Sequence, residues 1–277
     1  MGKGTVMVEK QNSSNRGEPV TNIVVVGGSA AGLKAACRVR RLLPDAQVIV
    51  VEAGEYISYA ACGMPYFLSG DIEQFDKLRA TPYGMVKDPE YFAAVKGVEV
   101  RTHLRALRID RDRKELHCDS TDTGESCVLP YDRLVLALGA RPVLPDIPGV
   151  ELGDVHTFTR PEDAIGLKKE CEMGQVGTVA LIGAGYIGLE LCEAFASLWG
   201  IDVTLFEMGD HVLPAQLDRE VARHVESTLR DAGIDIQLGT SCRGIHEGGG
   251  GLQITTPEGL YEKTFDRVII GVGLRPT

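Results

Sequence analysis

The sequence predicts an α/β protein made of two parallel-sheet units, and three observations carry this prediction. An apolar strand, a glycine-rich turn and a helix follow one another directly at residues 21–43, and the same order recurs at residues 177–199. Each helix is followed by a second apolar strand that ends in a glutamate. With 277 residues, 44% of them hydrophobic, the chain has enough apolar mass for two domains.

The first unit begins with the unbroken apolar run 21–27 (TNIVVVG), which is typical of a strand buried on both faces of a parallel sheet. After the glycine turn and a helix to about Leu43, the strand 47–51 ends in Glu52. This order is the Rossmann-like dinucleotide fingerprint: pyrophosphate meets the helix N-terminus, and the acid accepts a hydrogen bond from a ribose hydroxyl. Ser29 replaces the middle glycine, and its hydroxyl can donate to a phosphate. The candidate binding residues are Gly27, Ser29, Ala30, Ala31, Gly32 and Glu52. The alternative is a structural turn in a unit that binds no nucleotide.

The second unit repeats this order with a complete glycine motif. Residues 177–183 (GTVALIG) form the strand, a helix extends to about Trp199, and the strand 202–206 ends in Glu207. No Lys or Arg occurs at 208–211. A carboxylate at this place binds a free 2′-hydroxyl and repels a 2′-phosphate, so we expect NADH to be preferred over NADPH. The candidate binding residues are Gly183, Gly185, Tyr186, Ile187, Gly188 and Glu207.

Two similar segments follow the units, 131–142 (YDRLVLALGARP) and 265–276 (FDRVIIGVGLRP). Each is a strand that runs into small residues, so each can bring backbone beside a nucleotide; the candidates are Ala137, Gly139, Arg141 and Gly273. Three prolines at 142–149 indicate the crossing between units. We therefore expect a disordered or flexible segment at 1–20, one domain at 21–148 and another at 149–277. The four glycines 248–251 predict a hairpin tip.

Composition excludes several classes of protein. A formal net charge of −10 leaves no basic excess to bind nucleic acid or acidic lipid, so we expect small-molecule partners. No apolar run is long enough for a signal sequence or a membrane span, which makes the cytoplasm the expected location. The seven cysteines show neither CxxC nor Cys/His spacing, so we expect no metal site and mostly ordinary buried thiols.

The segment 58–66 (SYAACGMPY) contains Cys62, ten residues after Glu52. Together with both fingerprints, ALGARP and GVGLRP, it makes residues 21–277 resemble the pyridine nucleotide-disulfide reductase superfamily, in its single-cysteine branch of coenzyme A-disulfide reductases, NADH oxidases, NADH peroxidases and persulfide reductases. The resemblance implies FAD in the first unit, NADH in the second, Ser58 and Cys62 against the flavin, and Tyr186 as a gate over it. Dithiol members carry a second cysteine where this chain has Phe67. Oxidised Cys62 is therefore expected as a sulfenic acid or a mixed disulfide, with a buried structural thiol as the alternative.

Three functions follow as alternatives. The first is an NADH-dependent reductase of low-molecular-weight disulfides, persulfides or polysulfides, and the second an NADH oxidase or peroxidase acting through a sulfenic acid. The third is a nucleotide-binding module without catalysis. Lys34, Arg38 and Arg41 share a helix face by their spacing and are candidates for binding coenzyme A phosphates, with a solvated basic face as the alternative.

The resemblance also implies further family segments after Thr277: the last elements of the FAD domain and a C-terminal dimerisation domain. We therefore expect an incomplete FAD domain, weak FAD retention by this chain, and a homodimer for the intact protein.

Overall fold

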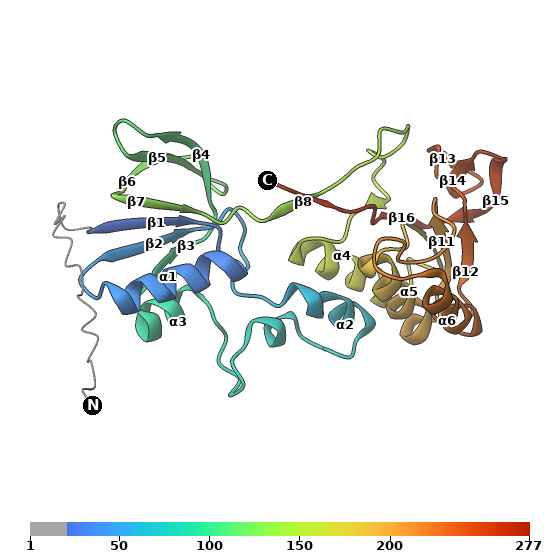
Figure 1. The fold of residues 1–277 in the computed structure, drawn as a ribbon, viewed down its shortest axis with the longest axis horizontal. Helices are drawn as coiled ribbons and strands as arrows, with labels where there is room; N and C mark the ends of the chain where they lie inside the picture. The colour runs from blue at the N-terminus through green and yellow to red at the C-terminus, as the bar shows by residue number, and fades with distance from the viewer. Residues whose placement is uncertain (1–20) are drawn as a thin grey trace, which may run out of the picture.

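The computed structural model describes residues 21–277, so the flexible segment expected at 1–20 lies outside the described residues. In this range the chain forms two units, each with a parallel sheet, at opposite ends of an elongated molecule (Figure 1). The predicted α/β class is confirmed, and each unit has three layers: helices, a parallel sheet and an antiparallel sheet. No helix in the described range is long and apolar enough to cross a membrane.

The first unit has a parallel sheet of order β3-β2-β1-β7. Helix α1 (Ala30–Leu42) packs on one face, and an antiparallel sheet of order β4-β5-β6 covers the other. Its strands are β1 (Asn22–Val26), β2 (Gln47–Val51), β3 (Glu99–Arg101), β4 (Leu104–Asp110), β5 (Glu115–Ser120), β6 (Ser126–Pro130) and β7 (Arg133–Leu136). The apolar runs read from the sequence are these central strands, buried between two layers.

The second unit repeats this architecture with sheet order β12-β11-β10-β16-β9. Helices cover one face: α4 (Pro161–Glu172), α5 (Tyr186–Trp199) and α6 (Arg219–Asp231). The parallel strands are β9 (Val155–His156), β10 (Thr178–Ile182), β11 (Asp202–Glu207), β12 (Asp235–Leu238) and β16 (Arg267–Ile270). The antiparallel layer on the other face comprises β13 (Gly244–Gly248), β14 (Gly251–Thr256) and β15 (Gly259–Phe265). Gly249 and Gly250, with φ of 62° and 87°, form the predicted hairpin tip.

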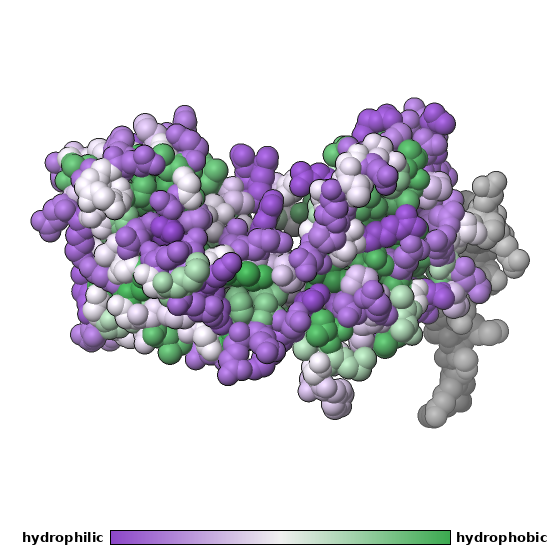
Figure 2. All heavy atoms as spheres, turned by 180° about the vertical axis from the view of Figure 1, so that it is seen from behind, coloured by the Kyte–Doolittle hydropathy of each residue, from purple (hydrophilic) through white to green (hydrophobic). Residues whose placement is uncertain are grey.

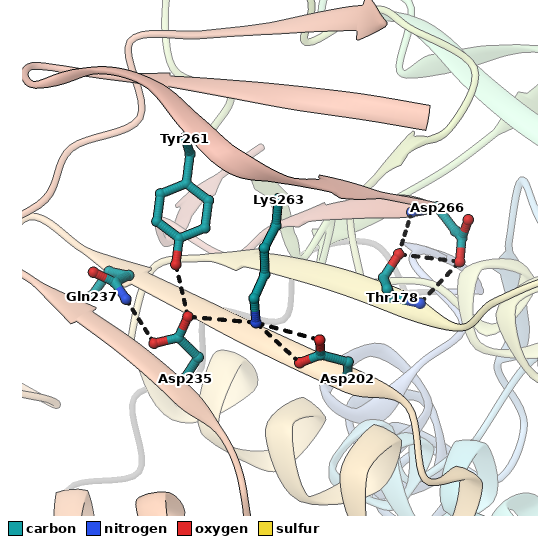
Figure 3. A network of polar contacts seen from close by, with 7 residues as sticks. All are labelled: Thr178, Asp202, Asp235, Gln237, Tyr261, Lys263 and Asp266. Atoms are coloured by element: carbon teal, nitrogen blue, oxygen red, sulfur yellow. Dashed lines mark hydrogen bonds and ion pairs between the residues drawn. The ribbon is translucent and has the colours of Figure 1, made fainter. Parts of the chain in front are cut away.

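A polar network ties the antiparallel layer to the amino ends of the parallel strands (Figure 3). The Tyr261 hydroxyl donates to Asp235 over 2.7 Å, and the Lys263 ammonium lies 3.3 Å from Asp202. Burial, and then the hydrogen bond to Asp235, raise the pKa of Tyr261. Because both aspartates begin their strands, this network lies at the edge opposite the glycine turn and holds layers together.

The two units are joined by an antiparallel ribbon. Strand β8 (Ala140–Pro142) pairs with β17 (Leu274–Pro276), which places the ALGARP and GVGLRP phrases side by side. The Val143 N–H donates to the Gly273 carbonyl over 2.9 Å. The predicted proline-rich crossing, residues 142–149, begins at the end of β8. Seen from behind in Figure 2, the units form two lobes with a hollow between them along the upper edge.

The segment that contains Cys62 bridges the units on their other side. A 3-10 turn at Ala61–Gly63 leads into the short helix α2 (Met64–Ser69), which packs on α4 and α5. Its buried side chains belong to the same hydrophobic core as the helices of the second unit. The chain returns to the first unit through a 3-10 turn (Phe75–Arg79) and then α3 (Pro89–Tyr91), which continues as a π-helical turn (Phe92–Lys96).

Candidate dinucleotide and redox site

Both glycine turns lie at the carboxyl edge of a parallel sheet, where the strand order reverses. In the first unit the Ala137 N–H donates to Val26 over 2.8 Å, which joins the ends of β1 and β7. In the second unit Gly271 and Ile182 make the equivalent 2.8 Å bond between β16 and β10. Open α/β sheets bind ligands in the crevice at such a reversal, so each unit presents one crevice.

The outer glycines of each turn are required by the fold. A Cβ on Gly27, which has φ of 113°, would lie 2.1 Å from the Ala137 oxygen. A Cβ on Gly32 would lie 1.9 Å from the Gly27 oxygen, and one on Gly188 would lie 2.1 Å from the Gly183 oxygen. These glycines let the helix begin directly against the strand that precedes it.

The middle position behaves differently. A Cβ on Gly185 would lie 4.0 Å from the Gly271 oxygen, an ordinary contact distance, so the packed protein leaves room for a side chain there. Ser29 takes this place in the first unit without disturbing the turn. The Ser29 hydroxyl makes no capping hydrogen bond within residues 21–277, and Gly185 has no side chain with which to make one. First-turn N–H groups of both helices are therefore left for a ligand. The space in front of each helix therefore fits a pyrophosphate.

Each of the two acids, Glu52 and Glu207, fixes its glycine turn by accepting hydrogen bonds from backbone N–H groups. Glu52 accepts from the N–H groups of Gly28 (2.7 Å) and Gly54 (3.0 Å). Glu207, 7% exposed, accepts from those of Ala184 (2.8 Å) and Gly209 (2.7 Å). Each oxygen retains lone-pair capacity for a second donor, so this pinned geometry is compatible with the ribose contact, which stays a prediction.

A cavity of about 830 Å³ opens at the carboxyl edge of the second sheet. Of the predicted residues, Gly183, Gly185, Tyr186, Ile187, Glu207 and Gly273 line it, whereas Gly188 is buried behind the turn. Sequence reasoning missed other lining residues, among them Phe158, Thr159, Met208, Pro214, Thr240, Ser241 and Cys242. Thr240 follows the end of β12, so the carboxyl-edge rule applied to every strand would have found it.

The charge of this cavity favours a ribose with a free 2′-hydroxyl over one that carries a 2′-phosphate. Glu207 lies in the wall, and no Lys, Arg or His is among the lining residues that belong to the described range. A 2′-phosphate would meet a carboxylate there without a compensating cation.

Cys62 is the most accessible of the seven thiols: it is exposed, whereas the other six are buried or partly buried. Ser58, in the left-handed region with φ of 54°, donates its N–H to the Gly28 oxygen over 3.0 Å. This bond fastens the cysteine segment to the glycine turn of the first unit. Burial raises the pKa of Cys118 and Cys171 to about 11 and that of Cys192 to about 12, so these thiols stay protonated at neutral pH.

A second cavity, of about 710 Å³, lies between α1 and the segment that returns from α2. Ser29, Ala30 and Ser58 line it together with Lys34 and Arg41. Arg38 is exposed but is not among the lining residues, so the structure brings two of the three predicted cations together. Lys87 and Lys96, which the helix spacing did not indicate, complete the basic wall. Two predicted residues are exposed at the ribbon that joins the units: Gly139, just before β8, and Arg141, within it. Both lie outside the two cavities, as do Gly27, Ala31, Glu52 and Ala137.

Comparison with known proteins decides the family, since a model described as pyridine nucleotide-disulphide oxidoreductase matches residues 21–277. The chain belongs to this family. It is 35% identical over 254 residues to the CoA-dependent NAD(P)H sulfur oxidoreductase of Pyrococcus abyssi, covering 92% of this chain and 54% of that protein. It is 31% identical over 254 residues to an NADH oxidase of Methanocaldococcus jannaschii, covering 91% of this chain and 54% of that protein.

Among solved structures, an NAD-dependent persulfide reductase from A. fulgidus is 41% identical with a TM-score of 0.87, covering 92% of this chain and 46% of that one. The chain thus spans about half the length of the curated relatives it matches.

Proposed function

We propose that this chain carries the FAD- and NADH-binding units of a reductase in which Cys62 passes electrons to a low-molecular-weight disulfide, persulfide or polysulfide. The observation that carries the proposal is Cys62 itself: an exposed thiol in a segment fastened to one glycine turn and packed on the helices of the other unit. Five residues further on, Phe67 is buried in the core, so the site has no neighbouring thiol at this place.

The first unit (21–148) holds FAD and the second (149–277) holds NADH. FAD, when bound, accepts a hydride from NADH and supplies two electrons to sulfur. Ser29 and Gly185 present the first-turn N–H groups to the two pyrophosphates, and Glu52 and Glu207 accept from ribose hydroxyls. Glu207 lies in a wall whose described residues include no Lys, Arg or His, and makes NADH the preferred donor.

Tyr186 is the gate between the two units. It is the first residue of α5, its side chain is 61% exposed, and it lies in the wall of the NADH cavity. A side chain so free can swing aside when a nicotinamide ring arrives.

At Cys62 the thiolate attacks one sulfur of a disulfide, forms a mixed disulfide and expels a thiolate. Two electrons and a proton then break the mixed disulfide, which releases the second thiol and restores the Cys62 thiolate. With a persulfide the expelled group is a thiol or hydrosulfide, so one cysteine serves the whole substrate class.

The basic cavity selects substrates that carry phosphates. Lys34, Arg41, Lys87 and Lys96 line it beside Ser58, four residues from Cys62. Coenzyme A would place its phosphates among these cations and its sulfur toward Cys62. That the Pyrococcus abyssi relative is named CoA-dependent supports this proposal. Arg38 contributes only to the surrounding field, and a homodimer of the intact protein remains a prediction.

An NADH oxidase acting through a sulfenic acid is the second candidate, favoured by relatives of that name. The test is NADH consumption by the purified, FAD-supplemented chain with coenzyme A disulfide and, separately, with oxygen, for the parent and Cys62→Ser. We expect C62S to abolish disulfide reduction while much two-electron oxygen reduction persists. Cys127→Ser, at a partly buried thiol in β6, is the control. Disulfide reduction that survives in C62S would refute the proposal.

A further inference from the structure

Helix α4 of the second unit contributes a buried lysine, Lys168, whose side chain contacts the segment that contains Cys62 and bridges the two units. It is 6% exposed, and its ammonium donates to the carbonyl oxygens of Ile72 and Glu73, each over 3.3 Å. The same nitrogen lies 4.2 Å from the ring centroid of Phe67. Within residues 21–277 no carboxylate forms an ion pair with it. Because an ammonium is costly to bury, two carbonyls and an aromatic face are the groups that compensate it.

All three partners belong to the segment that follows Cys62. Phe67 lies on α2, and Ile72 and Glu73 form the turn after that helix. The last carbonyls of a helix lack intrahelical partners, and here groups of the second unit approach the end of α2. Lys168 therefore contacts the cysteine segment through charge and not only through apolar packing.

A second polar contact lies on the next helix. The Trp199 indole N–H, at the end of α5, donates to the Leu68 carbonyl on α2 over 2.9 Å. Helix α5 begins at the glycine turn of the NADH cavity with Tyr186. Helix α5 thus contacts the NADH cavity at one end and helix α2, which follows Cys62, at the other. Since the chain has a single tryptophan, its fluorescence reports on the surroundings of this one indole.

We propose that Lys168 is a positioning residue, which holds the Cys62 segment in register with the NADH-binding unit through Phe67 and the Ile72–Glu73 carbonyls. The proposal rests on the redox role proposed for Cys62. Where dithiol members of the resembled superfamily have a second cysteine, this chain has Phe67, and the Lys168 ammonium lies over its ring. A small displacement of a reacting group costs much of its rate, so fixing this segment matters for electron delivery to sulfur.

The test compares Lys168→Met, which keeps most of the length and loses the charge, with Lys168→Arg, which keeps the charge, in the full chain. Lys169→Met removes the exposed neighbouring ammonium and is the matched control. Four quantities are measured: Trp199 emission before FAD is added, the rate of Cys62 alkylation by iodoacetamide, the Kd for NADH, and NADH-dependent reduction of coenzyme A disulfide.

For K168M we expect Trp199 emission at longer wavelength, Cys62 alkylation about threefold faster, and disulfide reduction slower on the order of tenfold, with the NADH Kd within about twofold. K168R should restore most of the alkylation and reduction rates, and K169M should match the parent. If K168M fails to fold, Trp199→Phe, which removes the indole donor, takes its place in the alkylation and reduction assays.

Unchanged Cys62 alkylation and reduction in a folded K168M, or equal losses in K168R, would overturn the positioning role. Failure of the proposed function looks different: C62S would retain disulfide reduction, whatever Lys168 does to Trp199 emission and Cys62 alkylation.

Discussion

The two dinucleotide units share a framework down to single hydrogen bonds. In each, an acid at the end of the second strand accepts from two backbone N–H groups, Glu52 in one and Glu207 in the other. In each, the aspartate directly before the neighbouring strand, β7 or β16, accepts from the start of the first strand: Asp132 from Asn22 over 2.8 Å and Asp266 from Thr178 over 2.9 Å. The common bonds define a scaffold that is independent of what either unit binds.

The units diverge six residues after the acid. Ser58 and Leu213 both have left-handed backbones, with φ of 54° and 51°, and both donate to a glycine-turn carbonyl. After Ser58 the chain enters the 3-10 turn of Cys62, whereas after Leu213 it proceeds to Asp218, the N-cap of α6. Cys62, and with it the redox chemistry we propose, therefore lies in a loop that only the first unit has, on a scaffold that both units share.

The largest effect expected from this comparison is on folding. Gly188→Ala forces a Cβ to 2.1 Å from a backbone oxygen, so we expect a loss of several kcal/mol, on the order of 3 or more, in the free energy of unfolding. Gly185→Ala has room in the protein but places a methyl group beside the space for a pyrophosphate. It should unfold at nearly the parent's denaturant midpoint while NADH binding, followed by fluorescence, weakens without being abolished, because the first unit accommodates Ser29 at the same place. Equal stability of the two variants would break the division into structural and ligand-contacting glycines.

The second largest effect is on thiol reactivity, which should differ between exposed Cys62 and the buried cysteines of the shared scaffold. At pH 8 a thiol of pKa about 11 is roughly 0.1% ionised, as for Cys118 and Cys171, and Cys192 less still. These raised pKa values mean that their labelling increases only as pH rises toward 11. Iodoacetamide should therefore modify Cys62 first, as peptide mass spectrometry would show. Labelling of Cys118 at a comparable rate in the folded protein would contradict the burial found for it.

A third prediction concerns the acid of the second unit. Glu207→Ala combined with Met208→Arg removes the carboxylate and adds a cation at the exposed position beside it. We expect the ratio of NADPH to NADH affinity to rise by at least about tenfold, since one new charge-assisted contact is worth roughly 1.5–3 kcal/mol. The loss of two hydrogen bonds under the glycine turn should also lower stability modestly. Met208→Ala serves as control. An unchanged ratio of NADPH to NADH affinity in the double variant would show that this wall does not distinguish a 2′-hydroxyl from a 2′-phosphate.

The smallest effect belongs to the position where the two glycine turns differ. Ser29→Gly makes the first turn match the second, and the open space at Gly185 indicates that the fold tolerates either residue. If the Ser29 hydroxyl donates to a phosphate, FAD affinity should fall by about fivefold, the worth of one hydrogen bond near 1 kcal/mol. Flavin fluorescence titration measures this, and tighter FAD binding by S29G would show that the side chain only obstructs.

Local spacing explains what could be predicted from the sequence. Strand, glycine turn, helix and acid lie within about thirty residues of one another, so periodicity and spacing were enough for both units and for Glu52 and Glu207. The left-handed Ser58 and Leu213 carry no such signal, because neither serine nor leucine favours a positive φ.

Contacts made by distant segments could not be predicted in this way. Lys168 and Ile72 are separated by 96 residues. Lys87 and Lys96 reach the basic cavity only because the chain returns from α2 to α1. Helix spacing likewise suggested Arg38, whose exposed side chain the cavity does not include.

We propose that Cys62 lies against a flavin that NADH reduces. Anaerobic titration of the FAD-supplemented chain with NADH, recorded as visible spectra for the parent and Cys62→Ser, tests this placement of the thiol. The placement predicts bleaching of the flavin absorbance in both proteins, with a long-wavelength thiolate-to-flavin charge-transfer band in the parent alone. Bleaching without that band in the parent, or the same band in C62S, would contradict it.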